Sequence, residues 1–97
     1  MKKETLIQLR KSNADILLLD IREAEELEGT AGIDGATHMP MGKVFTEAVK
    51  GSLPKDKHII VCCRTGGRAS VVERELRERG YQIDGLEGGL NEYESSE

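Results

Sequence analysis

Two continuous apolar runs stand out in a largely polar chain. Residues 16–19 read ILLL, and residues 59–62 read IIVC directly after His58. Runs of this length, without alternation of apolar and polar positions, are typical of strands buried on both faces of a parallel sheet. We therefore predict two central strands, one ending at Asp20 and the other, over residues 58–62, ending at the two cysteines.

Helical periodicity is clearest over residues 69–79. Ala69, Val72 and Leu76 fall on one face of a helix, and Gly80 is a natural stop after it. Weaker patterns predict helices over residues 4–11, 23–28 and 43–50, short strands over 36–39 and 81–86, and a last short helix or turn from Gly88. Strands that alternate with helices indicate an α/β domain with a mostly parallel sheet.

The carboxyl ends of parallel strands share one edge of a sheet, and ligands bind there. Asp20 ends the first central strand, and Cys62 and Cys63 end the second. We therefore expect Asp20 to lie near the segment that follows the cysteines.

Composition narrows the function classes. The chain has 97 residues, 3% of them aromatic, which predicts one domain over residues 1–97 with a core of Leu, Ile and Val. A net charge of -4, from 14 basic and 18 acidic residues, argues against a nucleic-acid partner. The N-terminal segment is too polar for a signal peptide, no run approaches a membrane span, and two adjacent cysteines make no disulfide framework. These features predict a cytoplasmic, monomeric protein without a membrane partner.

The segment over residues 61–70, VCCRTGGRAS, carries the candidate chemistry. A strand, a glycine-rich loop and a helix N-terminus in this order bind anions, because successive backbone N–H groups point into one concavity. Arg64 and Arg68 add positive charge to the same loop. A cysteine at the mouth of such a loop is stabilised as the thiolate, its nucleophilic form.

Three signatures in order resemble the rhodanese (sulfurtransferase) family over nearly the whole chain. They are Asp20-Ile21-Arg22-Glu23 with Glu26 and then Gly35-Ala36, Cys63-Arg64-Thr65-Gly66-Gly67-Arg68-Ala69, and Gly88-Gly89 followed by Tyr93. The departures from the family pattern are residues 31–34 (AGID) in place of Gly-His-Ile-Pro, Tyr93 in place of Trp, and Cys62 in place of an aromatic or aliphatic residue. The resemblance implies a rhodanese-like domain, a four- or five-stranded mostly parallel sheet with helices on both faces.

The two adjacent cysteines allow two registers of the loop. Five residues separate Cys62 from Arg68, the length of a phosphatase loop, whereas four separate Cys63 from Arg68, the sulfurtransferase length. Both patterns place a glycine three residues after the nucleophile, and this glycine is Gly66 only when counted from Cys63. We therefore expect Cys63 to be the nucleophile and Cys62 to pack as a small apolar residue, a strained resolving role for Cys62 being the alternative.

The resemblance implies sulfur transfer through a persulfide on Cys63. A small anionic donor (thiosulfate or polysulfide) would supply the sulfur, and a thiol, a protein thiol or cyanide would accept it, with no metal or organic cofactor. The loop residues expected to bind substrate are Arg64, Thr65, Gly66, Gly67 and Arg68. Arg64 is expected to dock the donor and Arg68 to brace the loop through Asp20 or Glu26, while Asp20, Arg22 and Glu26 form a supporting network. Gly88 and Gly89 are expected to form a tight turn that lets backbone approach the site.

Two other functions stay open at this point. One is a non-catalytic rhodanese-like interaction or regulatory module, which the intact Cys63 disfavours. The other is a phosphatase or arsenate reductase that uses the same loop, which the loop length disfavours.

Overall fold

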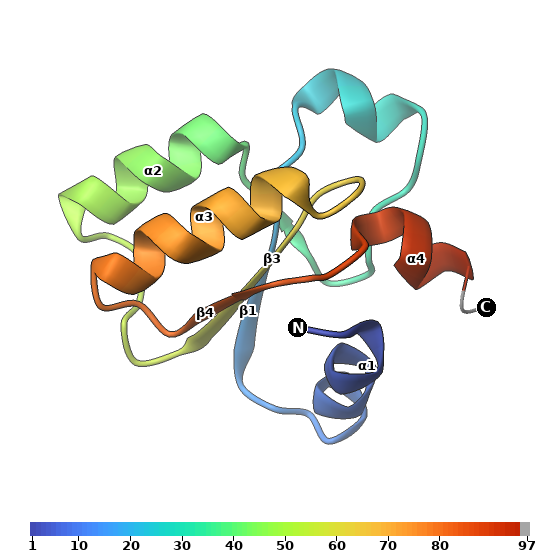
Figure 1. Cartoon of the computed structure of the whole chain (residues 1–97), viewed down its shortest axis with the longest axis horizontal. Helices are drawn as coiled ribbons and strands as arrows, with labels where there is room; N and C mark the ends of the chain where they lie inside the picture. Colours follow the sequence, from blue (N-terminus) through green and yellow to red (C-terminus); the bar gives the residue numbers. More distant parts are fainter. Residues whose placement is uncertain (96–97) are drawn as a thin grey trace.

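A parallel sheet of four strands lies between two layers of helices in the computed structural model, which describes residues 1–95 (Figure 1). The sheet order is β2-β1-β3-β4. The strands are β1 (Ile16–Asp20), β2 (Thr37–His38), β3 (His58–Cys62) and β4 (Ile83–Gly85). Of the four or five strands expected, four are present among these residues, and all their pairings are parallel.

The two apolar runs form the centre of the sheet, as predicted. β1 and β3 pair from Ile16 with His58 to Asp20 with Cys62. Side chains alternate between the faces of a strand, so Leu19 and Leu18 contribute to two separate buried clusters. The register places Asp20 directly beside Cys62 at the carboxyl edge of the sheet, as expected.

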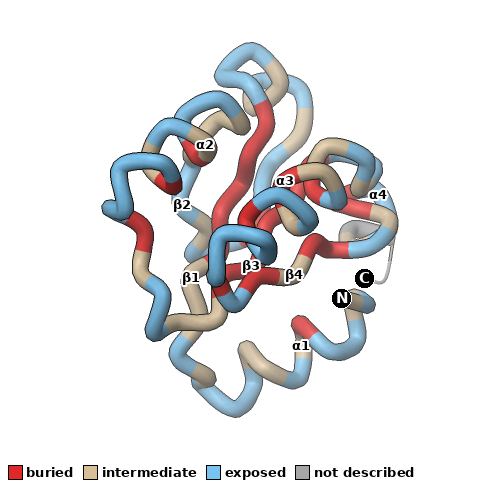
Figure 2. The backbone as a smooth tube through the Cα atoms, turned by 60° about the vertical axis from the view of Figure 1, so that its left-hand side comes forward, coloured by how far each residue is buried: buried red, intermediate tan, exposed pale blue. Residues whose placement is uncertain are grey.

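Helices cover both faces of the sheet (Figure 1). α2 (Met41–Lys50) and α3 (Gly67–Glu78) lie on one face, where Val44 and Val72 join a buried cluster with Leu19. α1 (Lys3–Lys11) and α4 (Gly89–Ser95) lie on the other face, where Leu6 and Leu90 pack with Leu18. Figure 2 shows the buried positions gathered along the central strands. A short 3-10 helix, η1 (Ala24–Glu28), follows β1.

The edge strands are shorter than the sequence pattern suggests. β4 covers three residues and β2 two. At β4, groups outside the sheet satisfy the backbone: Glu73 accepts the Gly85 N–H at 2.7 Å, and the Met1 amino group donates to the Gly85 carbonyl at 2.6 Å. These contacts occupy the open side of β4, where a further strand would otherwise pair.

Two helices begin two residues earlier than predicted. α3 begins at Gly67, because Gly66 has a left-handed backbone (φ +98°) that turns the chain directly into the helix. α2 begins at Met41, directly after Pro40, whose backbone is not yet helical (φ -53°, ψ 149°). Among residues 1–95, no helix combines the length and apolar character that a membrane crossing requires.

Candidate active site

Cys63 is the first residue after β3, where the chain turns into the loop. Its Sγ accepts the backbone N–H of Gly66 at 3.1 Å, and the residue is 1% exposed. α3 begins immediately after Gly66, so the positive end of its dipole also lies beside this loop. The Cys63 sulfur therefore meets a hydrogen-bond donor and lies beside the positive end of a helix dipole.

Cys62 lies in a different environment from its neighbour. It is fully buried in the cluster that contains Ile60 and Leu90, whereas Cys63 belongs to the cluster on the opposite face. Burial raises the pKa of the Cys62 thiol to about 12. A thiol with this pKa stays protonated at neutral pH, so the geometry favours Cys63 as the nucleophile and Cys62 as a packing residue.

α4 anchors the cysteine loop through its first backbone N–H groups. The N–H of Leu90 donates to the Cys63 carbonyl at 2.9 Å, and the N–H of Asn91 donates to the Arg64 carbonyl at 3.1 Å. Gly89 makes this approach possible, because a Cβ there would lie 2.5 Å from both carbonyl oxygens. The expectation that the Gly88-Gly89 turn brings backbone to the site is therefore confirmed.

Arg68 braces the loop through Glu26. Its Nη1 and Nη2 donate to the two carboxylate oxygens at 2.5 and 2.8 Å, so of the two predicted partners Glu26 is right and Asp20 is wrong. Arg68, and then the Glu23 backbone N–H, lower the pKa of Glu26 to about 2. The pKa of Arg68 is raised, first by Glu26 and also by the neighbouring Cys63 sulfur.

Asp20 and Arg22 form a buried pair instead. The Arg22 side chain donates to the Asp20 carboxylate from Nε at 3.0 Å and from Nη2 at 2.8 Å. Arg22 Nη1 also donates to the carbonyls of Thr30 at 2.9 Å and Glu26 at 3.4 Å. Asp20, Arg22 and Glu26 therefore form the connected support that the sequence predicted, with Arg22 linking the end of β1 to η1.

The predicted substrate-binding residues differ in how they meet Cys63. Gly66 contacts its sulfur, and Arg68 stands beside it. Arg64, Thr65 and Gly67 are exposed on the outside of the loop, and Arg64 Nη2 lies 3.7 Å from a Glu26 oxygen. Within the described part of the chain, these three residues face solvent without a hydrogen bond to the Cys63 sulfur, so their part in binding substrate stays a prediction.

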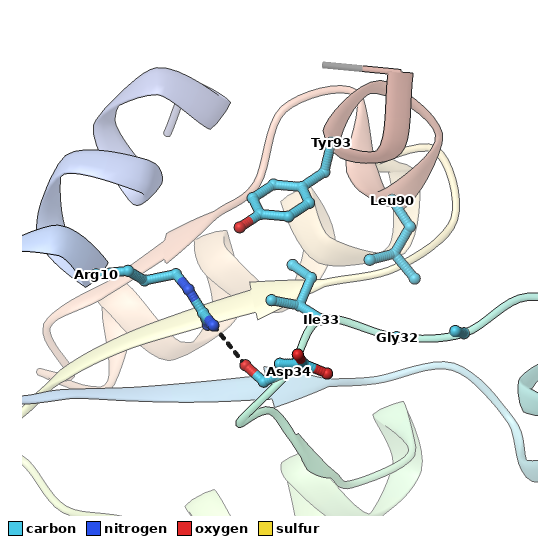
Figure 3. A pocket seen from close by; sticks show the side chains of 7 residues that line it. Arg10, Gly32, Ile33, Asp34, Leu90 and Tyr93 are labelled. Carbon is cyan, nitrogen blue, oxygen red and sulfur yellow. Dashed lines mark hydrogen bonds between the residues drawn. The ribbon is translucent and has the colours of Figure 1, made fainter. Parts of the chain in front are cut away.

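A groove of about 310 Å³ runs beside α4 on the face of the sheet opposite Cys63 (Figure 3). Arg10 of α1 and Tyr93 of α4 stand on its sides, and Ile33 and Leu90 line it between them. Arg10 Nη2 donates to the Asp34 carbonyl at 2.7 Å. Tyr93, the aromatic residue of the third signature, therefore faces this groove.

We expect Glu26→Gln to change how stability depends on pH. The pKa of Glu26 is lowered from its ordinary 4.5 to about 2 in the folded protein. Its pairing with Arg68 therefore stabilises the fold fully above pH 4.5, and this contribution is lost as pH falls toward 2. Urea unfolding at pH 7 and pH 3 is expected to show a stability difference between wild type and variant that shrinks on acidification. Glu25→Gln, which changes an exposed carboxylate of the same helix, is the control. A stability difference between wild type and Glu26→Gln that is the same at pH 7 and pH 3 would contradict the pairing of Glu26 with Arg68.

Comparison with known proteins agrees with this geometry. Residues 3–96 match the rhodanese-like domain family. The putative sulfurtransferase YtwF of Bacillus subtilis is 35% identical over 85 residues, 87% of this chain and 79% of that protein. The tRNA sulfurtransferase of Desulfurococcus amylolyticus is 35% identical over 79 residues, 81% of this chain, which spans only 15% of that longer protein. The solved rhodanese-related protein of Thermoplasma volcanium gives a TM-score of 0.82 at 25% identity, covering 99% of this chain and 90% of that one. The chain belongs to the rhodanese-like domain family.

Proposed function

We propose that this protein is a sulfurtransferase of the rhodanese type that carries sulfur as a persulfide on Cys63. The donor is thiosulfate or a polysulfide, and the acceptor is a thiol, a protein thiol or cyanide. The observation that carries the proposal is the placement of the Cys63 sulfur, 3.1 Å from the Gly66 nitrogen and at the start of α3. Relatives at 35% identity that bear sulfurtransferase names support the general activity.

The reaction has two displacements at sulfur. The Cys63 thiolate attacks the outer sulfur of thiosulfate; a new S–S bond forms, the S–S bond of the donor breaks, and sulfite leaves with the electron pair. The acceptor, for example cyanide, then attacks the outer sulfur of the persulfide. Thiocyanate leaves and the Cys63 thiolate is regenerated, so the cycle needs no external oxidant or reductant.

The loop supplies positive potential for both steps. The Gly66 N–H and the N-terminus of α3, which carries roughly half a positive charge, stabilise the thiolate and then the anionic persulfide. Arg64, whose side chain is 53% exposed, meets the donor. Arg68 holds the loop closed through Glu26.

Intact-protein mass spectrometry tests the proposal. Incubation with thiosulfate or polysulfide is expected to add the mass of one sulfur atom, and cyanide is expected to remove it as thiocyanate. An absence of the adduct with every donor would support a non-catalytic module. Turnover of an aryl phosphate without a sulfur adduct would support a phosphatase.

A further inference from the structure

One carboxylate engages both arginines of the cysteine loop. Glu26 binds Arg68 through two hydrogen bonds of 2.5 and 2.8 Å, and its Oε2 lies 3.7 Å from Arg64 Nη2. We call these three residues the mouth cluster. The side chains of Arg64, Arg68 and Glu26 are 53%, 36% and 21% exposed, whereas Cys63 is 1% exposed. The mouth cluster is therefore the solvent-facing part of the surroundings of the sulfur.

Glu26 is held in place from several directions. Besides Arg68, its Oε1 accepts the Glu23 backbone N–H at 3.0 Å. Its own carbonyl accepts a hydrogen bond from Arg22, which is fixed in the buried pair with Asp20. The bonds from Arg68 and the Glu23 N–H lower the pKa of Glu26 to about 2, so its carboxylate is ionised at neutral pH. The bond from Arg22 holds the Glu26 backbone in place.

The formal charges of the side chains around the sulfur consequently cancel, which leaves the Gly66 N–H and the N-terminus of α3 as the source of positive potential. Glu26 offsets one of the two arginines, and the Cys63 thiolate offsets the other. An anionic donor must compete with Glu26 for the guanidinium N–H groups of Arg64 and Arg68. The Glu26 carboxylate also repels the donor, and this repulsion grows with the negative charge of the donor.

We propose that Glu26 is a specificity-determining residue that makes the site select singly charged sulfane donors, such as organic persulfides, over dianionic thiosulfate. This inference rests on the proposed sulfur transfer. With an organic persulfide, the Cys63 thiolate attacks the outer sulfur, the S–S bond of the donor breaks, and the organic thiolate leaves. The product on Cys63 is the same persulfide in both cases, so Glu26 acts on donor choice and not on the chemistry that follows.

A matched pair of donors tests the proposal. Methanethiosulfonate carries one negative charge and thiosulfate two, although both transfer a terminal sulfur from an S–S bond. We expect wild type to show the higher kcat/KM with methanethiosulfonate, using cyanide as acceptor at low salt. Glu26→Gln is expected to raise kcat/KM for thiosulfate relative to methanethiosulfonate by about tenfold, because the second charge of thiosulfate no longer meets a fixed carboxylate.

Two controls separate charge from shape. Glu26→Asp keeps the negative charge at this position, so it should retain the donor ratio of wild type. Glu25→Gln removes an exposed carboxylate elsewhere on the same helix, and it should also retain that ratio. The preference of wild type for methanethiosulfonate should also shrink as salt is added, because salt screens the repulsion. This last measurement needs no variant and therefore stands even if Glu26→Gln loosens the loop.

Three results would overturn the inference. An unchanged donor ratio in Glu26→Gln, with or without an equal loss of kcat/KM for both donors, would reduce Glu26 to a structural brace while leaving sulfur transfer intact. A preference for methanethiosulfonate that grows with salt would mean that thiosulfate is attracted instead of repelled. Sulfur uptake by wild type from neither of these donors nor from polysulfide would reject the proposed function itself and, with it, this inference.

Discussion

Replacement of Cys63 by serine is expected to abolish sulfur uptake, with a loss of at least about a thousandfold in rate, because a hydroxyl is a far weaker nucleophile than a thiolate. The serine is close in shape and leaves the Gly66 N–H a hydrogen-bond acceptor, so the fold should survive. The measurement is the mass increase of the intact variant after incubation with thiosulfate or methanethiosulfonate, with wild type beside it.

Cys62→Ala is the matched variant, and it should keep sulfur uptake near the wild-type rate. Cys62 is buried, and burial raises the pKa of its thiol to about 12. Alanine leaves a small cavity, at a cost of about 1 kcal/mol in the free energy of unfolding. It is a better control than serine, which would bury a hydroxyl there. If Cys62→Ala loses uptake and Cys63→Ser keeps it, the five-residue register is right and a phosphatase-type loop returns to consideration.

The sequence predicted the centre of the sheet better than its edges. β1 and β3 are buried on both faces, so their apolar runs are uninterrupted and easy to recognise. β2 and β4 pair on one side only. Their ends depend on which other groups reach the backbone, as Glu73 and Met1 do at Gly85. Such contacts join residues far apart in the chain and leave no local pattern.

The candidate site, like the sheet, could be predicted from the sequence only in part. The loop motif and its spacing identify Cys63, Gly66 and Arg68, and the structure brings these three together. The choice between Asp20 and Glu26 as the partner of Arg68 needed the structure, because Asp20 ends β1, Glu26 lies just after it, and only the structure shows that Arg22 binds Asp20. The approach of backbone at the Gly88-Gly89 turn was predicted, but the donors that anchor the loop, the N–H groups of Leu90 and Asn91, were not, because every residue except proline has a backbone N–H.

Gly89→Ala is expected to damage stability and activity together. Gly89 has φ +59°, and a Cβ there would lie 2.5 Å from the carbonyl oxygens of Cys63 and Arg64. The strained backbone and the clash together should cost about 3 to 5 kcal/mol in the free energy of unfolding. Relief of the clash requires α4 to move away, which breaks the bonds from Leu90 and Asn91.

Gly51→Ala isolates the backbone contribution to this effect. Gly51 also has a left-handed backbone (φ +75°), but nothing lies within 4 Å of its Cβ position, so alanine should cost only about 1 to 2 kcal/mol. Urea unfolding gives both costs, and the sulfur-uptake rate is measured where both variants are folded. That rate should fall at least about tenfold in Gly89→Ala alone, because a loop released by α4 no longer holds its N–H groups around the sulfur. A destabilised Gly89→Ala that still reacts at the wild-type rate would show that α4 supports the fold without organising the loop for chemistry.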